Sequence, residues 1–484
     1  MEKTYLSIQT TLIVTLIVGV FFVALGYINS RKTPDNNKSH IVGDRNEGIF
    51  SLTTSLSASA LGAWILFGPA SAATWGGIGA VLGYALGTAA PMLFLLNFGP
   101  KIRKEFPNGM SLTEFVKKRF GLGILKIILF LILFYLTIFL IAEVTAIAFL
   151  LNLISRTPLW VTAGLTLIIC LLYILKGGFK LSIITDKYQF IIIALMIVLS
   201  LSLTLGNMEV NSFKLIKEKS PILLSKNYIP NYTAGLTFFM AVAATNLFHQ
   251  GNWQRVFAAK NNFILKKSLI YSAIITFLIV LWMGYSGLIA FSLDSKINPD
   301  LAFFYLILSN ENFLIIISIL VLALALTLST IDTLINAITS LIIIDGKKIS
   351  KSLNGKKIKE KANKLILFLS AVVLIFASKG FSILYLFLLA DLLCCAAVVT
   401  VFYGFINKKI NLRIASFSIL FGLIFGLLFF PDQSFQSSLL VGNILSKEIF
   451  SEFISSNLLF ISFALSLIAP LLIITIYSFR SSFK

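Results

Sequence analysis

The sequence contains few charged residues, and it is also poor in cysteine and histidine. Of its 484 residues only 12% are Asp, Glu, Lys or Arg, against about 25% in a typical soluble domain. So little charge cannot cover a globular surface, which excludes a soluble globular protein. Three cysteines and two histidines give no disulfide framework and no metal-ligand spacing. Phosphate-cradling, zinc-protease and serine-hydrolase motifs are also missing, so we expect no ATP hydrolysis within the chain.

Apolar residues make up 58% of the chain, and the mean hydropathy is +0.94. A helix needs about 20 apolar residues to cross about 30 Å of hydrocarbon. The apolar runs are continuous rather than alternating, which favours helices over barrel strands. We therefore predict an all-α polytopic membrane protein, with the lipid bilayer around it and no soluble domain. The thirteen predicted spans are 7–29, 48–70, 75–98, 123–154, 158–175, 182–206, 231–250, 267–292, 313–344, 362–378, 381–406, 411–430 and 456–479.

The formal net charge of +20 is unevenly distributed between the connections. Alternate connections, together with the C-terminal tail, carry 29 of the 40 Lys and Arg residues. By the positive-inside rule these connections are cytoplasmic, so the N-terminus is predicted outside and the C-terminus inside. The basic block 347–364 is then a topology anchor, and no nucleic-acid partner is expected. We predict a multi-pass protein of the plasma (inner) membrane, and the sequence leaves its oligomeric state open.

One predicted span carries a row of polar side chains in LTLSTIDTLINAI, residues 326–338. At 100° per residue, its hydroxyl, amide and carboxyl groups fall on one stripe of the helix. One interpretation is hydrogen bonding between helices. The other is a site for a hard monovalent cation, which several hydroxyl and carbonyl oxygens and one carboxylate would suit. The residues of this stripe are Ser329, Asp332, Thr333, Asn336 and Ser340, with Thr330 beside it.

Four acidic residues lie within predicted spans: Glu143, Asp186, Asp332 and Asp391. Each costs at least about 2.5–3.5 kcal/mol to insert at the helix centre, so each needs a partner, a wet cavity or a function. For Glu143 and Asp391 the sequence leaves two roles open, a structural hydrogen bond or contact with a substrate. If both were ionised and faced the pocket, a cationic amine would be the preferred substrate.

Two segments are predicted to interrupt their helices. Small and hydroxyl residues crowd 55–63, where Gly62 weakens the helix further, and 243–246 reads Ala-Ala-Thr-Asn. Broken helices near the membrane midplane expose backbone carbonyls that bind ions and solutes in transporters. Close helix packing is the alternative interpretation of the small residues. Because one segment opens each half of the chain, we favour the transport interpretation.

Four motifs, in order along the chain, resemble those of the sodium/solute symporters. Residues 329–333 with Asn336 are similar to the family's Ser-(Ser/Thr)-x-Asp-Ser signature, and Asp345 closes the span. KGGFKLSIITDKYQ (176–189), VGDRN (42–46) and PNGMSLTEFVKKRFG (107–121) resemble three further segments. The resemblance runs from about residue 42 to about residue 406.

The resemblance implies a LeuT-type core of two inverted five-helix repeats. They would span 48–206 and 231–406, joined by an extracellular loop at 207–230. Residues 1–47 would form a first helix and a cytoplasmic loop, and 407–484 two further helices. It also implies a sodium site made by the hydroxyls of Ser329 and Thr330 and three backbone carbonyls, and a second sodium position near Asp186. The carbonyls would come from Ala60, Ala63 and Leu326, and Asp332 and Thr333 would share the second position.

The resemblance further implies sodium-coupled uptake of a small polar solute by alternating access, without enzymatic activity. FHQGNWQRVFAAK (248–260) and residues 90–121 are similar to the urea-transporting branch, so urea or another small nitrogenous compound is favoured. Both segments are predicted to be loops that carry no pocket chemistry. The alternatives are a passive channel for a neutral solute and a multi-span enzyme or redox-pump subunit. The predicted substrate-binding residues are Ser59, Trp64, Glu143, Thr245, Asn246 and Asp391.

Overall fold

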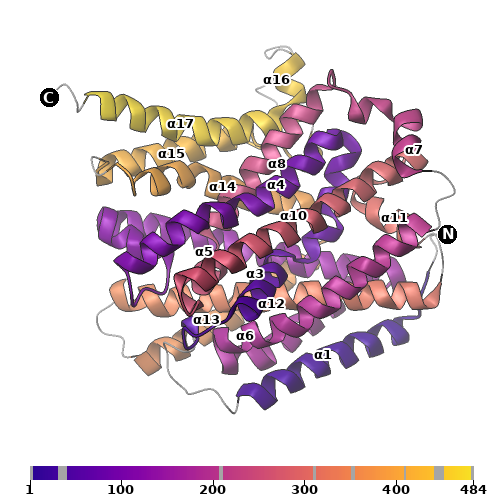
Figure 1. Cartoon of the computed structure of the whole chain (residues 1–484), viewed down its shortest axis with the longest axis horizontal. Helices are drawn as coiled ribbons and strands as arrows, with labels where there is room; N and C mark the ends of the chain where they lie inside the picture. The colour runs from indigo at the N-terminus through magenta and orange to yellow at the C-terminus, as the bar shows by residue number, and fades with distance from the viewer. Residues whose placement is uncertain are drawn as a thin grey trace.

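The computed structural model describes residues 4–30, 41–206, 211–308, 312–349, 355–407, 410–435, 437–440 and 452–480. Most of its helices run along one common direction, and the marked ends of the chain lie at opposite ends of the bundle (Figure 1). A chain that crosses the membrane an odd number of times must have its two termini on opposite sides, and this arrangement agrees with the thirteen predicted spans.

Each predicted span falls on a helix or on a section of one, except that helical structure is interrupted within 48–70 and near the end of 231–250. Within the described residues, nine helices are long and apolar enough to cross a membrane on their own. The elements are α1 (Ile8–Ser30), α3 (Ile49–Ala60), η1 (Ala63–Leu66), α4 (Gly68–Glu105), α5 (Leu112–Ser155), α6 (Leu159–Gly206), α7 (Ser212–Lys219), η2 (Pro221–Leu224), α8 (Ile229–Phe248), α9 (Gln250–Ala258), α10 (Asn262–Leu293), η3 (Pro299–Leu301), α11 (Ala302–Leu308), α12 (Phe313–Ile349), α13 (Gly355–Ala377), α14 (Ile383–Tyr403), α15 (Leu412–Phe429), α16 (Glu452–Ser456) and α17 (Leu458–Arg480).

Three of the continuous helices contain a sharp turn at a glycine. Gly77 in α4 has φ 57° and ψ −157°, Gly121 in α5 has φ 83° and ψ −173°, and Gly178 in α6 has φ 57° and ψ −150°. A side chain would be strained at all three positions. At Gly77 a Cβ would also lie 2.3 Å from Asn231 Oδ1. The turn between the second and third spans therefore comes at Gly77, later than the predicted connection at 71–74.

The first of the predicted interruptions is present in the structure. Helix α3 ends at Ala60, Leu61 and Gly62 have non-helical dihedral angles, and the chain resumes as η1. Every residue from Ser51 to Ala60 is buried. This segment packs against α6, α10 and α12, so its freed backbone groups face protein rather than lipid, as an interrupted membrane helix requires.

The second interruption lies elsewhere than predicted. Helix α8 continues through 243–246 and ends at Phe248, and His249, with φ −64° and ψ 110°, separates it from α9. The prediction of a break at 243–246 is therefore wrong. Thr245 and Asn246 donate hydrogen bonds to carbonyls one turn earlier, at 3.1 and 3.0 Å. Alanine is also the best helix former, so the segment stays helical.

The helices divide into a buried centre and a lipid-facing periphery. The apolar windows of α12 and α14 are 72% and 83% buried, whereas those of α1 and α17 are each 28% buried. Helix α12, which carries the polar stripe, packs against α3, η1, α5, α6 and α9. The stripe therefore faces protein.

Candidate transport site

The hydroxyl pair on α12 lies against the interruption in α3. A Cβ on Gly62 would lie 2.8 Å from Thr330 Oγ1, so only glycine leaves room for this approach. Thr330 also donates to the carbonyl of Leu326 at 3.1 Å. Ser329 and Thr330 are 0% and 4% exposed. The polar stripe thus contacts the segment that contains Ala60 and Ala63. The helix is interrupted there, so backbone carbonyls are not all used in helical hydrogen bonds.

Glu143 on α5 stabilises the interrupted backbone. Its Oε2 accepts a hydrogen bond from the N–H of Ala63 at 2.8 Å. A Cβ on Gly62 would lie 2.2 Å from its Oε1, an atom with no hydrogen-bond partner among the described residues. Of the two roles left open by the sequence, this geometry supplies a structural hydrogen bond. It also places a carboxyl group beside the predicted sodium ligands.

A buried ion pair lies next to Ser329. The guanidinium of Arg255 on α9 donates from Nη2 to Asp186 Oδ2 at 2.8 Å, and both side chains are 0% exposed. Ser329 donates to Asp186 Oδ1 at 2.8 Å, and Ser55 on α3 donates to Oδ2 at 2.5 Å. Arg255 Nε donates to Ser55 at 2.8 Å, and Nη2 reaches Thr333 at 3.3 Å. The pair joins α3, α6, α9 and α12.

Asp332 is the second carboxyl group of this region, one turn along α12 from Ser329. Tyr173 donates to Oδ2 at 2.9 Å and Ser182 to Oδ1 at 2.8 Å. Thr185 donates to Oδ2 at 3.3 Å. All three donors come from α6. We name the set around both carboxyl groups the inner cluster; its members are Ser55, Tyr173, Ser182, Thr185, Asp186, Arg255, Ser329, Asp332 and Thr333.

Arg255 was not predicted as a site residue. It belongs to 248–260, which was expected to be a loop, and the expectation of a loop is wrong. Residues Gln250 to Ala258 form α9, and all of them are buried. Arg255 could have been identified from its position next to an apolar run. A guanidinium inside a membrane protein needs an acidic side chain or backbone carbonyls as partners, so this arginine indicated a buried ion pair. With both carboxyl groups ionised, the inner cluster has two negative charges and one positive.

A small cavity lies where the two interruptions meet. It has a volume of about 40 Å³ and contains Ala60 from the end of α3 and His249 from the end of α8. A water molecule occupies about 10–15 Å³ on this measure, so the cavity admits a small polar group but not a whole organic solute. We call it the central cavity; it is lined by Ser59, Ala60, Trp64, Tyr84, Phe139, Val242, Asn246, His249, Thr330, Phe387 and Asp391.

The central cavity combines one carboxyl group with aromatic rings. Asp391 on α14 is 4% exposed, and its Oδ1 has no hydrogen-bond partner among the described residues. Trp64 and Tyr84 stack at 5.8 Å between ring centroids. Phe139 packs edge-to-face on Phe387 at 4.7 Å. A carboxylate surrounded by aromatic faces is the arrangement that binds ammonium groups, because both attract positive charge.

The structure brings four of the six predicted substrate-binding residues together. Ser59, Trp64, Asn246 and Asp391 line the central cavity, whereas Glu143 and Thr245 do not. Thr245 does not line the cavity, but its hydroxyl lies beside Asp391. Tyr84, Phe139 and Phe387 could not be predicted as lining residues, because single aromatic residues in apolar runs look like ordinary packing residues.

Comparison with known proteins identifies the family. The family model of the sodium:solute symporter family matches residues 40–422. The chain belongs to this family. Among curated proteins, the spermidine transporter DUR31 of Candida albicans is 25% identical over 387 residues, which is 79% of this chain and 72% of that protein.

Solved structures of other transporters share the fold of this symporter. A Na⁺-coupled sialic acid symporter in a substrate-bound outward-open state matches with a TM-score of 0.71 at 18% identity, covering 95% of this chain and 98% of the other. Mhp1, a nucleobase-cation-symport-1 family transporter with bromovinylhydantoin bound, matches with a TM-score of 0.52 at 15% identity, covering 91% and 94%. These matches confirm the all-helical LeuT-type architecture.

The symporter is therefore a multi-pass membrane transporter that couples solute movement to sodium, and it is not an enzyme. Membership of the family removes the passive channel and the redox-pump subunit from consideration. The prediction of urea finds no support, since the relative's named substrate is spermidine.

Proposed function

We propose that this symporter takes up a small organic amine in its cationic form across the plasma membrane, driven by sodium. The observation that carries the proposal is Asp391 Oδ1 in an aromatic cavity, without a hydrogen-bond partner in the part of the chain that the structure describes. A buried carboxyl oxygen without a donor is unfavourable, and a ligand ammonium group would satisfy it. A neutral solute such as urea could donate a hydrogen bond there but would not balance the charge. The spermidine transporter among its relatives agrees with a cationic substrate.

The co-transported sodium would bind between α12 and the interruption in α3. Its ligands would be the hydroxyls of Ser329 and Thr330 and the carbonyls of Ala60, Ala63 and Leu326. These oxygens suit a hard cation, and the neighbouring Glu143 would add negative charge. Because Ser329 also contacts Asp186, binding here would be linked to the ion pair with Arg255.

A second sodium would bind in the inner cluster. Arg255 balances one of its two carboxyl groups, so one negative charge remains when both are ionised. Thr333 contacts Arg255 at 3.3 Å and lies 3.4 Å from Asp332 Oδ1. Asp186, Asp332 and Thr333 would therefore hold this ion, with Arg255 setting how much negative charge is left for it.

The size of the central cavity supports transport by alternating access. At about 40 Å³ it is too small for a polyamine, so the helices around it must move apart for a solute to enter. Both interruptions border it, and the ends of α3 and α8 can shift without breaking a continuous helix. Cations bound to α3, α12 and α14 would change the packing between these helices, which couples the two substrates.

The energetics favour a cationic substrate. Each charge that moves inward through a membrane potential gains about 2.3 kcal/mol per 100 mV. With a singly charged amine, one sodium ion and the amine together gain about twice this amount. A neutral solute gains only the contribution of sodium.

The test is uptake of labelled spermidine, a labelled monoamine and labelled urea into proteoliposomes with an inward sodium gradient. We expect sodium-dependent uptake of the amines that an inside-negative potential increases. Replacing external sodium by potassium or choline should remove it. Amine uptake that persists without sodium would contradict sodium coupling, and uptake of urea alone would contradict the cationic substrate.

A further inference from the structure

One carboxyl oxygen of Glu143 is left over by the fold. The side chain is 0% exposed, and Oε2 accepts the hydrogen bond from the N–H of Ala63. Oε1 is also buried, and it has no hydrogen-bond partner in the part of the chain that the structure describes. Leaving a buried polar atom unpaired is unfavourable. A ligand that pairs with Oε1 would therefore stabilise this arrangement.

No basic side chain balances the charge of this carboxyl group. The ion pairs of the described residues do not include Glu143, and its hydrogen bond comes from a backbone N–H. Asp186, which accepts a hydrogen bond from Ser329, is instead paired with Arg255. A carboxylate at membrane depth needs a positive partner or a wet surrounding. For Glu143, a cation from solution can supply that partner.

A single cation could contact both Glu143 and Thr330. A Cβ on Gly62 would lie 2.2 Å from Glu143 Oε1 and 2.8 Å from Thr330 Oγ1. These two distances add to 5.0 Å, so the two oxygens are at most 5.0 Å apart. Sodium is close to calcium in size, and a hard cation of that size binds oxygens at about 2.3–2.6 Å. Two oxygens on one such cation are at most about 5 Å apart, and this pair meets that condition.

The hydroxyl of Thr330 is oriented to act as a ligand. It donates its proton to the carbonyl of Leu326 at 3.1 Å, which leaves the lone pairs of Oγ1 available to a cation. Thr330 also lines the central cavity, together with Asp391. A cation held by Glu143 and Thr330 would thus lie beside the wall of the cavity that is proposed to bind the amine.

We propose that Glu143 is a direct, negatively charged ligand of the sodium ion, with Oε1 on the ion and Oε2 on the N–H of Ala63. The ligand set implied by the family resemblance contains only hydroxyls and carbonyls, which are uncharged, and Glu143 adds a carboxylate to it. The site is negative when empty and neutral with sodium bound. Glu143 then links the bound ion to the interruption in α3. This inference rests on the sodium site proposed above.

The first experiment measures sodium binding to purified protein in the absence of any solute, with labelled sodium and through the sodium-induced rise in melting temperature. Glu143→Gln removes the charge, but its amide oxygen can still accept the hydrogen bond from Ala63. We expect the Kd for sodium to rise about tenfold or more, because a charged ligand binds a cation more strongly than a neutral one. Glu143→Asp keeps the charge on a shorter side chain and should be intermediate.

The same variant separates a ligand from a purely structural acceptor. In sodium-free buffer the melting temperature of Glu143→Gln should equal or exceed that of the wild type, because a buried charge without a cation is removed. In saturating sodium the order should reverse, since only the wild type gains the full stabilisation. A structural hydrogen bond alone would give the same order in both buffers, and this result would overturn the inference.

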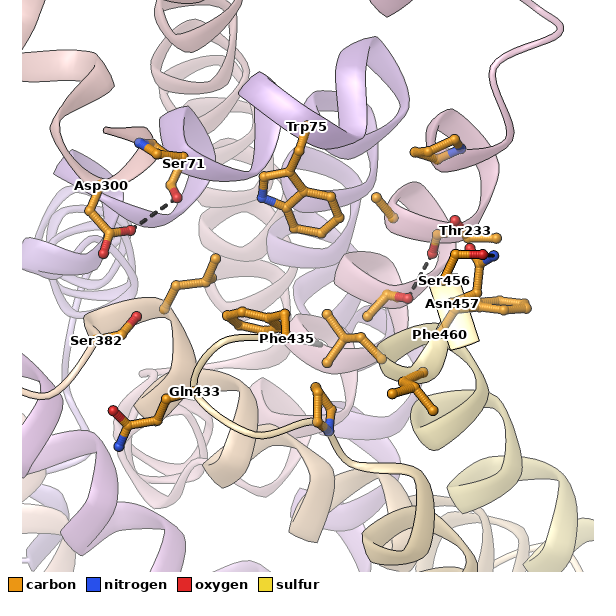
Figure 2. A pocket seen from close by; sticks show the side chains of 18 of the residues that line it. Ser71, Trp75, Thr233, Asp300, Ser382, Gln433, Phe435, Ser456, Asn457 and Phe460 are labelled. Atoms are coloured by element: carbon orange, nitrogen blue, oxygen red, sulfur yellow. Dashed lines mark hydrogen bonds between the residues drawn. The ribbon is translucent and has the colours of Figure 1, made fainter. Parts of the chain in front are cut away.

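Asp300→Asn is the matched control for the loss of one negative charge. Asp300 on η3 accepts a hydrogen bond from Ser71 at 3.0 Å, as the dashed line in Figure 2 marks. It lines another cavity, of about 430 Å³, whose wall does not include Glu143 or Thr330. Asparagine can accept the same hydrogen bond. The Kd for sodium should therefore be that of the wild type, and an equal loss of affinity in both variants would reduce the effect of Glu143→Gln to net charge.

The outcomes also separate this inference from the sodium site on which it rests. If replacing both Ser329 and Thr330 by alanine weakens sodium binding but Glu143→Gln binds sodium as the wild type does, the site stands and the role of Glu143 as a ligand is refuted. If the double alanine variant itself binds sodium like the wild type, the ion lies elsewhere and both proposals are wrong.

Discussion

The inner cluster and the central cavity both contain buried carboxyl groups, but these groups differ in how many of their oxygens accept hydrogen bonds. In the inner cluster, Asp186 receives hydrogen bonds from Ser55, Ser329 and Arg255. In the central cavity, Asp391 keeps an oxygen without a partner among the described residues. A carboxylate with every oxygen paired fixes the positions of helices, whereas one left unpaired is available to a ligand. We propose from this difference that Asp186 holds the helices together and that Asp391 recognises the solute.

The largest effect is expected for Arg255→Met. The substitution leaves Asp186 as an unpaired buried charge, and breaking a buried pair from one side costs about 3–5 kcal/mol. We expect a large loss of thermal stability in detergent and no transport. Arg255→Lys keeps the charge but cannot reach Ser55, Gly251 and Asp186 together, and should be intermediate. A stable Arg255→Met protein with normal transport would show that the inner cluster is not structural.

Asp391→Asn should remove transport without unfolding the protein. Truncating one side of a buried charge pair with the substrate costs about 2–5 kcal/mol, which corresponds to at least about a 30-fold loss of kcat/KM for spermidine. The melting temperature should stay the same or rise, because the substitution removes a buried negative charge that has no cation beside it. Unchanged amine uptake would mean that Asp391 is a structural residue and would remove the contrast with Asp186.

Replacing both Ser329 and Thr330 by alanine should abolish sodium stimulation while the protein remains folded. The two hydroxyls are proposed sodium ligands, and alanine keeps the helix intact because of its high helix propensity. The measurement is uptake as a function of external sodium, together with spermidine binding in sodium-free buffer, which should persist. A sodium response like that of the wild type would reject both residues as ligands.

Gly62→Ala should have a moderate effect at the boundary between the two regions. The added Cβ would lie 2.2 Å from Glu143 Oε1 and 2.8 Å from Thr330 Oγ1. Overpacking of this kind costs about 1–3 kcal/mol, and the half-saturating sodium concentration should rise. Gly346→Ala on α12 is the matched control, because a Cβ there meets nothing within 4 Å. Equal behaviour of both variants would contradict the close approach of α3 and α12.

The fold was largely predictable from the sequence because lipid imposes one strong rule, that each crossing needs a continuous apolar helix. The interruption in α3 was also predictable, since Gly62 follows a run of small residues. The interruption before α9 was predicted several residues too early. Because Ala243 and Ala244 are small, they suggested a weak point in the helix, but alanine favours helix formation. No local sequence signal marks His249 as the residue after the end of α8.

The sequence by itself determined the all-helical membrane class, the polar stripe on α12 and the acids that required an explanation. Only the tertiary structure decided which acid meets which partner. Arg255 and Asp186 are 69 positions apart, and Trp64, Tyr84 and Asp391 meet through packing of three separate segments. Hydropathy is a property of each residue and its near neighbours, whereas the pairing of a buried charge depends on which distant atoms the fold brings within hydrogen-bond distance.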